Sequence, residues 1–338
     1  MASANLDGTD YLFASYTGSQ AFMIQYTDGS TNSSNELAFE GLTYDTGGGS
    51  NVSPERQGFG DKTNNQIVTS MLGGKDYMYI GIKNTNLGGK VYLGTTLAGG
   101  TPALNFSGTD GKDAVFNSGG DPNVGGTQAS AMEIFSCSGT DTLFLGLAHS
   151  SGPKMYKTTQ IGVKPATFNS VDLSSLSNDN VDVTALKATV DGTTLYLATE
   201  NSKGAQVWKT TDCTTFSKVV DFADGTGLTA ADTANTRVNF LEANGTTKKY
   251  LYFGTEKSSG GFEVWRSASN DTSAFTQVGV DDSTCKDEGA ADSFGSADVF
   301  INARNSISVK SKNRLFISVQ EGANATSGGT KVYRVDDD

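Results

Sequence analysis

Residues 183–199 read VTALKATVDGTTLYLAT. Apolar and polar side chains alternate over residues 183–188, and a second apolar run over residues 195–199 follows the dipeptide Asp191-Gly192. Asp-Gly between two apolar runs is a strong hairpin signal, because both residues tolerate a positive φ. The stretch therefore predicts two antiparallel strands joined by a tight turn.

The second strand of this hairpin carries a short apolar segment that ends on a small residue, and the same segment recurs along the chain. The copies are Leu12-Phe13-Ala14-Ser15, Met78-Tyr79-Ile80-Gly81, Leu143-Phe144-Leu145-Gly146, Leu195-Tyr196-Leu197-Ala198, Leu251-Tyr252-Phe253-Gly254 and Leu315-Phe316-Ile317-Ser318. Their starts are 66, 65, 52, 56 and 64 residues apart, which is the size of one four-stranded sheet with its loops. The spacing predicts an all-β fold, a six-bladed β-propeller of four-stranded antiparallel blades, with residues 1–338 as a single domain.

Composition limits the classes of partner. The chain has 25 Lys and Arg against 37 Asp and Glu, a net charge of -12, and no run of basic residues. Nucleic acid and anionic membranes are therefore not expected as partners. No segment approaches the roughly 18 apolar residues that cross a bilayer, so membrane insertion is not expected either.

The N-terminal residues bear on the compartment. Met1-Ala2-Ser3-Ala4 contains the small residues that flank signal cleavage sites, so we expect an extracellular or cell-surface protein whose signal peptide has been removed. An ordinary cytosolic start is the alternative. The chain has three cysteines, Cys137, Cys213 and Cys285, and because this count is odd at least one thiol is free in a monomer. A bridge between Cys137 and Cys213 is conceivable, but we expect three unpaired structural cysteines.

Polar residues recur near the predicted innermost strands, where a propeller has the mouth of its central channel. These candidates for ligand binding are Gln66, Gln128, Asp182, Arg237 and Arg304. Polar side chains that converge on one axis from successive blades suit a small polar ligand. The alternative is that they fill the channel and hold water.

The long connections hold most of the acidic residues. The densest groups contain Asp110 and Asp113, and Asp281, Asp282 and Asp287. Clustered carboxylates and loop carbonyls supply the hard oxygens that Ca²⁺ prefers, although neither group fits an EF-hand loop. Calcium is thus the one inorganic ligand that we consider, and solvated surface acids are the alternative. We expect no other cofactor.

The repeat of this chain resembles the repeat of a known family. Residues 57–65, QGFGDKTNN, with Ser70-Met71 and then Tyr77-Met78-Tyr79-Ile80-Gly81, are similar to the repeat of exported bacterial and archaeal propellers. Residues 260–266, GGFEVWR, and residues 204–212, GAQVWKTTD, look like the same unit. The resemblance implies a secreted or surface module for binding or assembly, and it carries no catalytic residues.

A distant similarity to sialidase-like propellers gives the enzymatic alternative. Residues 210–216, TTDCTTF, resemble the structural turn called the Asp box, but are one residue short and contain no glycine. A sialidase also needs three arginines for the substrate carboxylate, a tyrosine nucleophile and an acid or base. Of the six arginines, Arg266 and Arg334 lie in predicted third strands. The single histidine, His149, is expected in a surface turn.

These observations lead to one functional prediction with two alternatives. We expect a non-catalytic binding or adhesion module that holds a glycan or protein ligand on the loop face around the channel. The first alternative is a structural subunit of an extracellular assembly, which would self-associate through an incomplete last blade. The second is a sialidase-like glycan hydrolase.

Overall fold

The computed structural model of this chain consists mainly of β-strands. It describes residues 2–18, 21–31, 33, 40–41, 44–45, 51–52, 59, 63–84, 88–96, 104–105, 114–117, 126–149, 151–163, 166–228, 231–245, 249–257, 263–268, 271–278, 300–309, 314–321 and 330–336. The chain divides into two compact units. Unit 1 comprises residues 1–133, 142–150 and 154–170, and unit 2 comprises residues 134–141, 151–153 and 171–338.

Unit 1 holds the first fifteen strands, apart from the tip of the β12–β13 hairpin, which belongs to unit 2. The strands are β1 (Ala2–Leu6), β2 (Thr9–Gly18), β3 (Ala21–Thr27), β4 (Glu40–Gly41), β5 (Tyr44–Asp45), β6 (Asn51–Val52), β7 (Asn65–Gly74), β8 (Tyr77–Asn84), β9 (Lys90–Thr96), β10 (Leu104–Asn105), β11 (Phe116–Asn117), β12 (Gly126–Cys137), β13 (Thr140–His149), β14 (Lys154–Thr158) and β15 (Asn169–Ser170).

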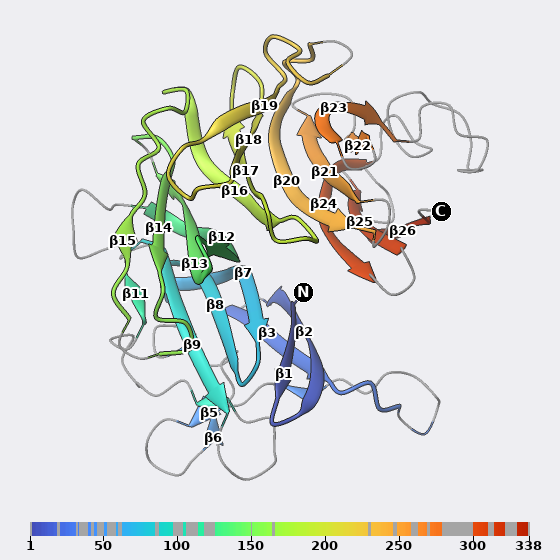
Figure 1. The fold of residues 1–338 in the computed structure, drawn as a ribbon. Coiled ribbons are helices and arrows are strands. Elements are labelled where there is room, and N and C mark those ends of the chain that lie inside the picture. Colours follow the sequence, from blue (N-terminus) through green and yellow to red (C-terminus); the bar gives the residue numbers. More distant parts are fainter. Residues whose placement is uncertain are drawn as a thin grey trace. The chain divides into compact units, whose positions relative to one another are not determined.

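Within unit 1 many strands pair antiparallel with the next one along the chain, as in β1–β2–β3–β4, β5–β6, β7–β8–β9 and β13–β14–β15. Strands β1 to β4 form one antiparallel sheet, and β7, β8 and β9 run side by side in cyan in Figure 1. The turn from β1 to β2 consists of Asp7 and Gly8, with φ of 51° and 80°. Two left-handed residues make a type I′ turn, whose twist fits the flanking strands.

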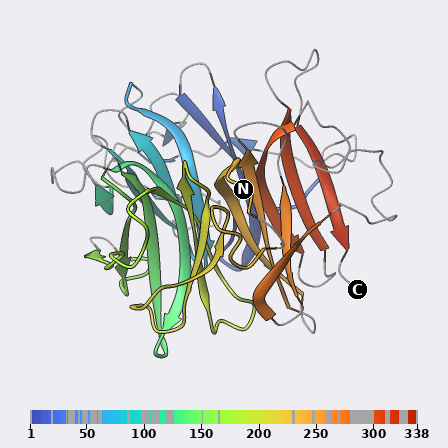
Figure 2. The same cartoon turned by 90° about the horizontal axis from the view of Figure 1, so that it is seen from above.

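Unit 2 continues the same pattern. Its strands are β16 (Asn180–Ala188), β17 (Leu195–Asn201), β18 (Gln206–Thr210), β19 (Ser217–Asp221), β20 (Asn235–Asn244), β21 (Tyr250–Lys257), β22 (Val264–Ala268), β23 (Asp271–Gln277), β24 (Phe300–Val309), β25 (Arg314–Glu321) and β26 (Thr330–Asp336). They pair antiparallel as β16-β17-β18-β19, β20-β21-β22-β23 and β24-β25-β26, the last group drawn in red in Figure 2.

The prediction of an all-β fold with antiparallel sheets is confirmed, and all six copies of the apolar segment lie in strands (β2, β8, β13, β17, β21 and β25). The number of blades, their four-stranded form and the single domain stay predictions. The turn within residues 183–199 differs from the expected one. It spans six residues, from Thr189 to Thr194, and Gly192 has a positive φ of 66° whereas Asp191 does not.

Two β-bulges interrupt the first strand of several groups of strands. In β16 the register shifts between Asn180 and Asp182 and again between Val183 and Ala185. Strands β7, β20 and β24 carry shifts at the corresponding positions. A bulge places two residues opposite one and turns the strand locally, so it re-aims the side chains at the strand's start.

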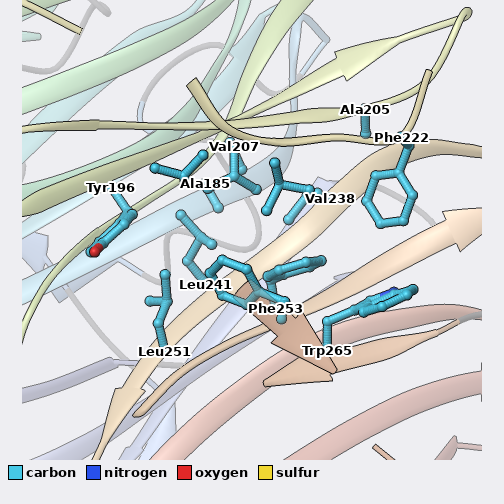
Figure 3. Close-up of a cluster of buried hydrophobic side chains, with 14 residues drawn as sticks. Ala185, Tyr196, Ala205, Val207, Phe222, Val238, Leu241, Leu251, Phe253 and Trp265 are labelled. Atoms are coloured by element: carbon cyan, nitrogen blue, oxygen red, sulfur yellow. The ribbon is translucent and has the colours of Figure 1, made fainter. Parts of the chain in front are cut away.

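The largest described core of unit 2 lies between the sheet β16–β19 and the sheet β20–β23. Figure 3 shows Val207, Leu241 and Phe253 among its side chains. Phe253 stacks on Trp265 with ring centroids 6.4 Å apart, and Phe222 packs edge-on against the same indole at 5.8 Å. Burial of this apolar surface fixes the two sheets against each other and so fixes the starts of β16 and β20.

The structure corrects two expectations. Cys137 and Cys213 form a disulfide with a Cα–Cα distance of 5.9 Å, so the expectation of three unpaired cysteines is wrong. Cys285 lies outside the described residues. His149 is the last residue of β13 and is buried rather than exposed in a turn. That burial, with the nearby charge of Lys154, lowers the pKa of His149.

Within the ranges described above, no helix has the length and hydropathy to cross a bilayer.

Candidate functional site

Asp182 and Arg237, two of the predicted ligand-binding residues, are in direct contact in unit 2. Arg237 Nη2 donates a hydrogen bond to Asp182 Oδ2 at 3.1 Å, and Nη1 donates to Glu200 Oε2. Nε donates to Asn239 Oδ1 at 3.1 Å. Asn239 Nδ2 in turn lies 3.5 Å from Glu256 Oε2. We call these five residues the Arg237 cluster.

The Arg237 cluster grades from buried to exposed. The side chains of Asp182, Arg237 and Glu200 are 2%, 24% and 38% exposed. The five residues include three carboxylates, those of Asp182, Glu200 and Glu256, and one guanidinium. Its outer part offers carboxylate and amide groups to solvent, while its inner carboxylate holds the arginine in place. Such a surface can accept hydrogen bonds from hydroxyl or ammonium groups.

A buried polar network fixes the start of β16. Asn180 Oδ1 accepts hydrogen bonds from Thr199 Oγ1 at 2.8 Å and from Asn201 Nδ2 at 3.2 Å. Asn180 Nδ2 donates to Gln206 Oε1 at 2.8 Å, and Gln206 Nε2 donates to Asp221 Oδ2 at 2.8 Å. Three strands are thereby tied to the residue that lies two positions before Asp182. Satisfied buried networks of this kind rigidify the backbone that carries them.

A second network holds the start of β20 in the same way. Asn235 Nδ2 donates to Glu263 Oε2 at 2.8 Å, and Trp265 Nε1 donates to the same oxygen at 3.0 Å. The other oxygen of Glu263 accepts from Lys257 Nζ at 2.9 Å, and Lys257 also pairs with Asp232 at 2.9 Å. Burial opposes the charge of Lys257, but these two carboxylates outweigh it and raise the pKa of the ammonium group.

The register of the strands shows which candidate residues are equivalent. Glu200 of β17 lies opposite Arg237 of β20, Glu256 of β21 lies opposite Asn302 of β24, and Lys83 of β8 lies opposite Gln128 of β12. Gln128 therefore occupies, in unit 1, the position that Arg237 occupies in unit 2.

Gln66 and Arg304 are not at that position. In β7, β20 and β24 the first bulge follows a residue that is paired at the start of the strand, namely Asn65, Asn235 and Phe300. Gln66 comes one residue after that start, Arg237 two and Arg304 four. Asn302, rather than Arg304, is thus the counterpart of Arg237.

The calcium candidates Asp110, Asp113, Asp281, Asp282 and Asp287 all lie outside the described residues. Among the residues that the structure does describe, no group of three or more His, Cys, Asp or Glu side chains is arranged to hold a metal ion. Calcium binding therefore stays an untested expectation.

Glu200 and Glu256 were not among the residues predicted from the sequence. Each lies two residues after the end of an apolar segment, in Ala198-Thr199-Glu200 and Gly254-Thr255-Glu256. The repetition of the same acid in two neighbouring copies is the signal that could have identified them.

The turn that resembles an Asp box is built around Asp212 in the structure. Asp212 Oδ1 accepts hydrogen bonds from the amides of Thr214 and Thr215 at 2.9 and 2.7 Å, and these bonds lower the pKa of its carboxyl. Cys213 takes the left-handed conformation, with φ of 64°, that a glycine would favour. It is also the residue that bonds to Cys137, so this turn anchors the disulfide.

Comparisons with known proteins show the fold alone. No protein-family model and no curated protein matches the chain in sequence. The structure is similar to a putative 6-phosphogluconolactonase from Bacteroides uniformis, with a TM-score of 0.52 and 12% identity over 99% of this chain and 84% of that one. It is also similar to a protein from Lactobacillus plantarum, with a TM-score of 0.51 and 13% identity over 96% of this chain and 82% of that one.

A third similarity, to Trypanosoma rangeli sialidase, has a TM-score of 0.48 and 11% identity over 98% of this chain and 54% of that one. The chain spans from 41% to 63% of the length of this sialidase, of two GH74 enzymes and of an α-L-arabinofuranosidase from Podospora anserina. At this level of similarity these enzymes carry no argument about activity. The chain has an all-β fold of antiparallel sheets that is consistent with propeller-type structures.

Proposed function

We propose that this chain is a non-catalytic glycan-binding module of an extracellular or cell-surface protein, and that its ligand binds at the Arg237 cluster. The ligand class is a neutral or amino glycan. Hydroxyl and ammonium groups donate hydrogen bonds, and Glu200, Glu256 and Asn239 offer oxygen acceptors for them.

One observation carries the proposal: all three kinds of donor nitrogen on Arg237 are engaged by Asp182, Glu200 and Asn239. A guanidinium held in this way orients carboxylate and amide groups for a ligand. Three of its five N–H donors are thereby committed to acceptors of the protein, whereas an arginine that clamps the carboxylate of a sialic acid offers a free fork of two donors.

The same geometry argues against hydrolysis. Asp182 and Glu200 are register partners across β16 and β17, so two carboxyls lie close together as in many glycosidases. Both carboxylates are already engaged by the guanidinium of Arg237. We therefore assign the pair a binding role.

We further propose the six-bladed propeller as the frame of this site. Six successive groups of strands support it, namely those that contain the pairs β1–β2, β7–β8, β13–β14, β16–β17, β20–β21 and β24–β25. The proposed location is supported by the Cys137–Cys213 disulfide, because such bonds persist mainly in oxidising compartments.

The test is isothermal titration with cellohexaose, mannohexaose and a chitosan hexamer, with product analysis of the same samples. We expect one of these glycans to bind without being cleaved. Glu200→Gln should weaken its binding about tenfold, because a charged acceptor is replaced by a weaker one. Asp224→Asn is the control, since it removes one exposed carboxylate elsewhere in unit 2.

Three results would contradict the proposal. Cleavage of any of the three glycans would make the chain a hydrolase. Equal binding by the wild type and Glu200→Gln would place the ligand elsewhere. Absence of binding, together with particles that grow with concentration in light scattering, would favour the structural-subunit alternative.

A further inference from the structure

A pocket lies in unit 2 at the ends of β16 and β20 that are far from the Arg237 cluster. Its volume is about 180 Å³. It is lined by Thr189, Val190, Asp191, Thr193, Thr194, Tyr196, Lys209, Ala243, Lys249, Tyr250, Leu251 and Thr272. Sites for drug-sized ligands measure about 300–1,000 Å³, so this pocket suits a single small group.

One wall of the pocket is a turn held by hydrogen bonds. The amide of Thr189 donates to the carbonyl oxygen of Thr194 at 2.8 Å. Asp191 Oδ1 accepts from Thr189 Oγ1 at 2.6 Å and from Thr193 Oγ1 at 2.8 Å. The wall is therefore formed before any ligand arrives, which reduces the entropy cost of binding.

Two tyrosines, Tyr196 and Tyr250, also line the pocket. The hydroxyl of Tyr196 donates to Thr272 Oγ1 at 2.6 Å and so joins β17 to β23. The guanidinium of Arg266 lies 5.0 Å from the ring centroid of Tyr250. In Figure 3 the ring of Tyr196 lies at the edge of the apolar cluster near Leu251, and both residues line the pocket. The lining thus combines aromatic and apolar surface with hydroxyl groups.

The two lysines of the pocket differ in their partners. Lys249 Nζ binds Asp191 Oδ2 at 3.1 Å. The hydrogen bonds to Thr189, Thr193 and Lys249 hold the pKa of Asp191 well below its usual range, so the carboxylate of Asp191 stays charged. Lys209 is half-buried, and within the described part of the chain its ammonium group has no hydrogen-bond or ion-pair partner. In a chain with net charge -12, this lysine gives the pocket an unbalanced positive charge.

We propose that this pocket binds one acidic sugar residue, with the sugar's carboxylate on Lys209 and its ring among Tyr196, Tyr250 and the threonine hydroxyls. The unbalanced ammonium group calls for an anion. Hydroxyls that both donate and accept match sugar hydroxyls, and aromatic surface matches the C–H face of a pyranose ring. The site is separate from the Arg237 cluster, and it requires no catalytic step.

Titration of the intact chain with methyl glucuronide, methyl glucoside and inorganic sulfate tests this site. Methyl glucuronide should bind, and the uncharged glucoside and the bare sulfate should each bind at least about tenfold more weakly. Lys209→Gln should weaken methyl glucuronide binding by about the same factor without changing the melting temperature. Lys203→Gln is the control, because it removes an exposed lysine of unit 2 that is paired with Asp179.

Any of four results would overturn the proposal. Methyl glucuronide could fail to bind up to about 10 mM, or methyl glucoside or sulfate could bind as tightly as methyl glucuronide. Lys209→Gln could also bind methyl glucuronide as tightly as the wild type does. Glu200→Gln should leave methyl glucuronide binding unchanged, so failure here and failure of the proposed glycan site are told apart. Tyr250→Leu provides a second test, since it should weaken methyl glucuronide binding while the charge of Lys209 is retained.

Discussion

Asp182 and Arg237 each lie two residues after a buried asparagine that begins a strand, and Arg237 Nη2 donates a hydrogen bond of 3.1 Å to Asp182 Oδ2. The two strands, β16 and β20, belong to neighbouring sheets, so this contact joins the sheets at their starts. The same bulge precedes both residues. The repeated backbone geometry thus brings an acid of one repeat to a base of the next.

Replacing Arg237 by Met should destabilise the chain by about 1–3 kcal/mol, because Asp182 is buried and loses a charged donor. Asp182→Asn in the Arg237→Met background should recover part of that loss, since the buried charge is then removed as well. Urea denaturation measures both effects. A wild-type free energy of unfolding for Arg237→Met would show that the contact contributes nothing to stability.

Trp265 and Trp208 offer a comparison of the same indole with and without a partner. Trp265 Nε1 donates to Glu263, whereas Trp208 Nε1 is buried without a hydrogen bond among the described residues. Trp265→Phe should therefore cost about 1–3 kcal/mol more in free energy of unfolding than Trp208→Phe. Chemical denaturation of the two variants checks this, and equal losses would mean that the Glu263 hydrogen bond is not stabilising.

The lowered pKa of Asp191 predicts a pH dependence. A carboxyl with a lower pKa in the folded state stabilises the fold above its unfolded value, about 3.9, and that contribution is lost as the pH falls toward the folded value. The melting temperature of Asp191→Asn should thus fall less than that of the wild type between about pH 5 and pH 2. Asp141→Asn, at an exposed position, is the control. Parallel curves for the wild type and Asp191→Asn would refute the prediction.

The Cys137–Cys213 disulfide should be measurable in two ways. Thiol titration of the denatured, unreduced chain should find one free thiol, and three after reduction, because the sequence has three cysteines of which two are bonded. Replacing both bonded cysteines by serine should lower the free energy of unfolding by about 2–5 kcal/mol, since the bond restricts the unfolded chain. Three free thiols before reduction would show that the bond does not form.

Much of the fold could be predicted from local sequence. The apolar segments such as Leu195-Tyr196-Leu197-Ala198 lie in strands because β-prone residues favour extended backbone. The bulges at Asn180 and Asn235 could not be predicted, because two residues facing one leave no mark on composition. The turn from Thr189 to Thr194 also differs, since Asp191 stabilises it with its carboxylate rather than with a positive φ.

The Arg237 cluster was predictable only in part, because the pairing register between strands cannot be read from local sequence. Asp182 and Arg237 were candidates from their place at the starts of strands, and the structure brings them together. The tripeptide Asn302-Ala303-Arg304 is similar in sequence to Asn235-Thr236-Arg237, and this similarity predicts Arg304 as the equivalent of Arg237. The register instead aligns Asn302 with Arg237. Glu200 was missed because its contact with Arg237 depends on the pairing of β17 with the next sheet, which no local pattern encodes.

The most direct test of glycan binding at the Arg237 cluster is an NMR titration that follows the Nε–H signal of Arg237 as the best-binding neutral or amino glycan is added. The Arg237→Lys variant assigns this signal. If the glycan binds at the Arg237 cluster without cleavage, this signal shifts to saturation while the anomeric signals of the glycan stay those of the intact oligosaccharide. An unmoved Arg237 signal, or new anomeric signals from cleaved sugar, would contradict glycan binding without cleavage at this cluster.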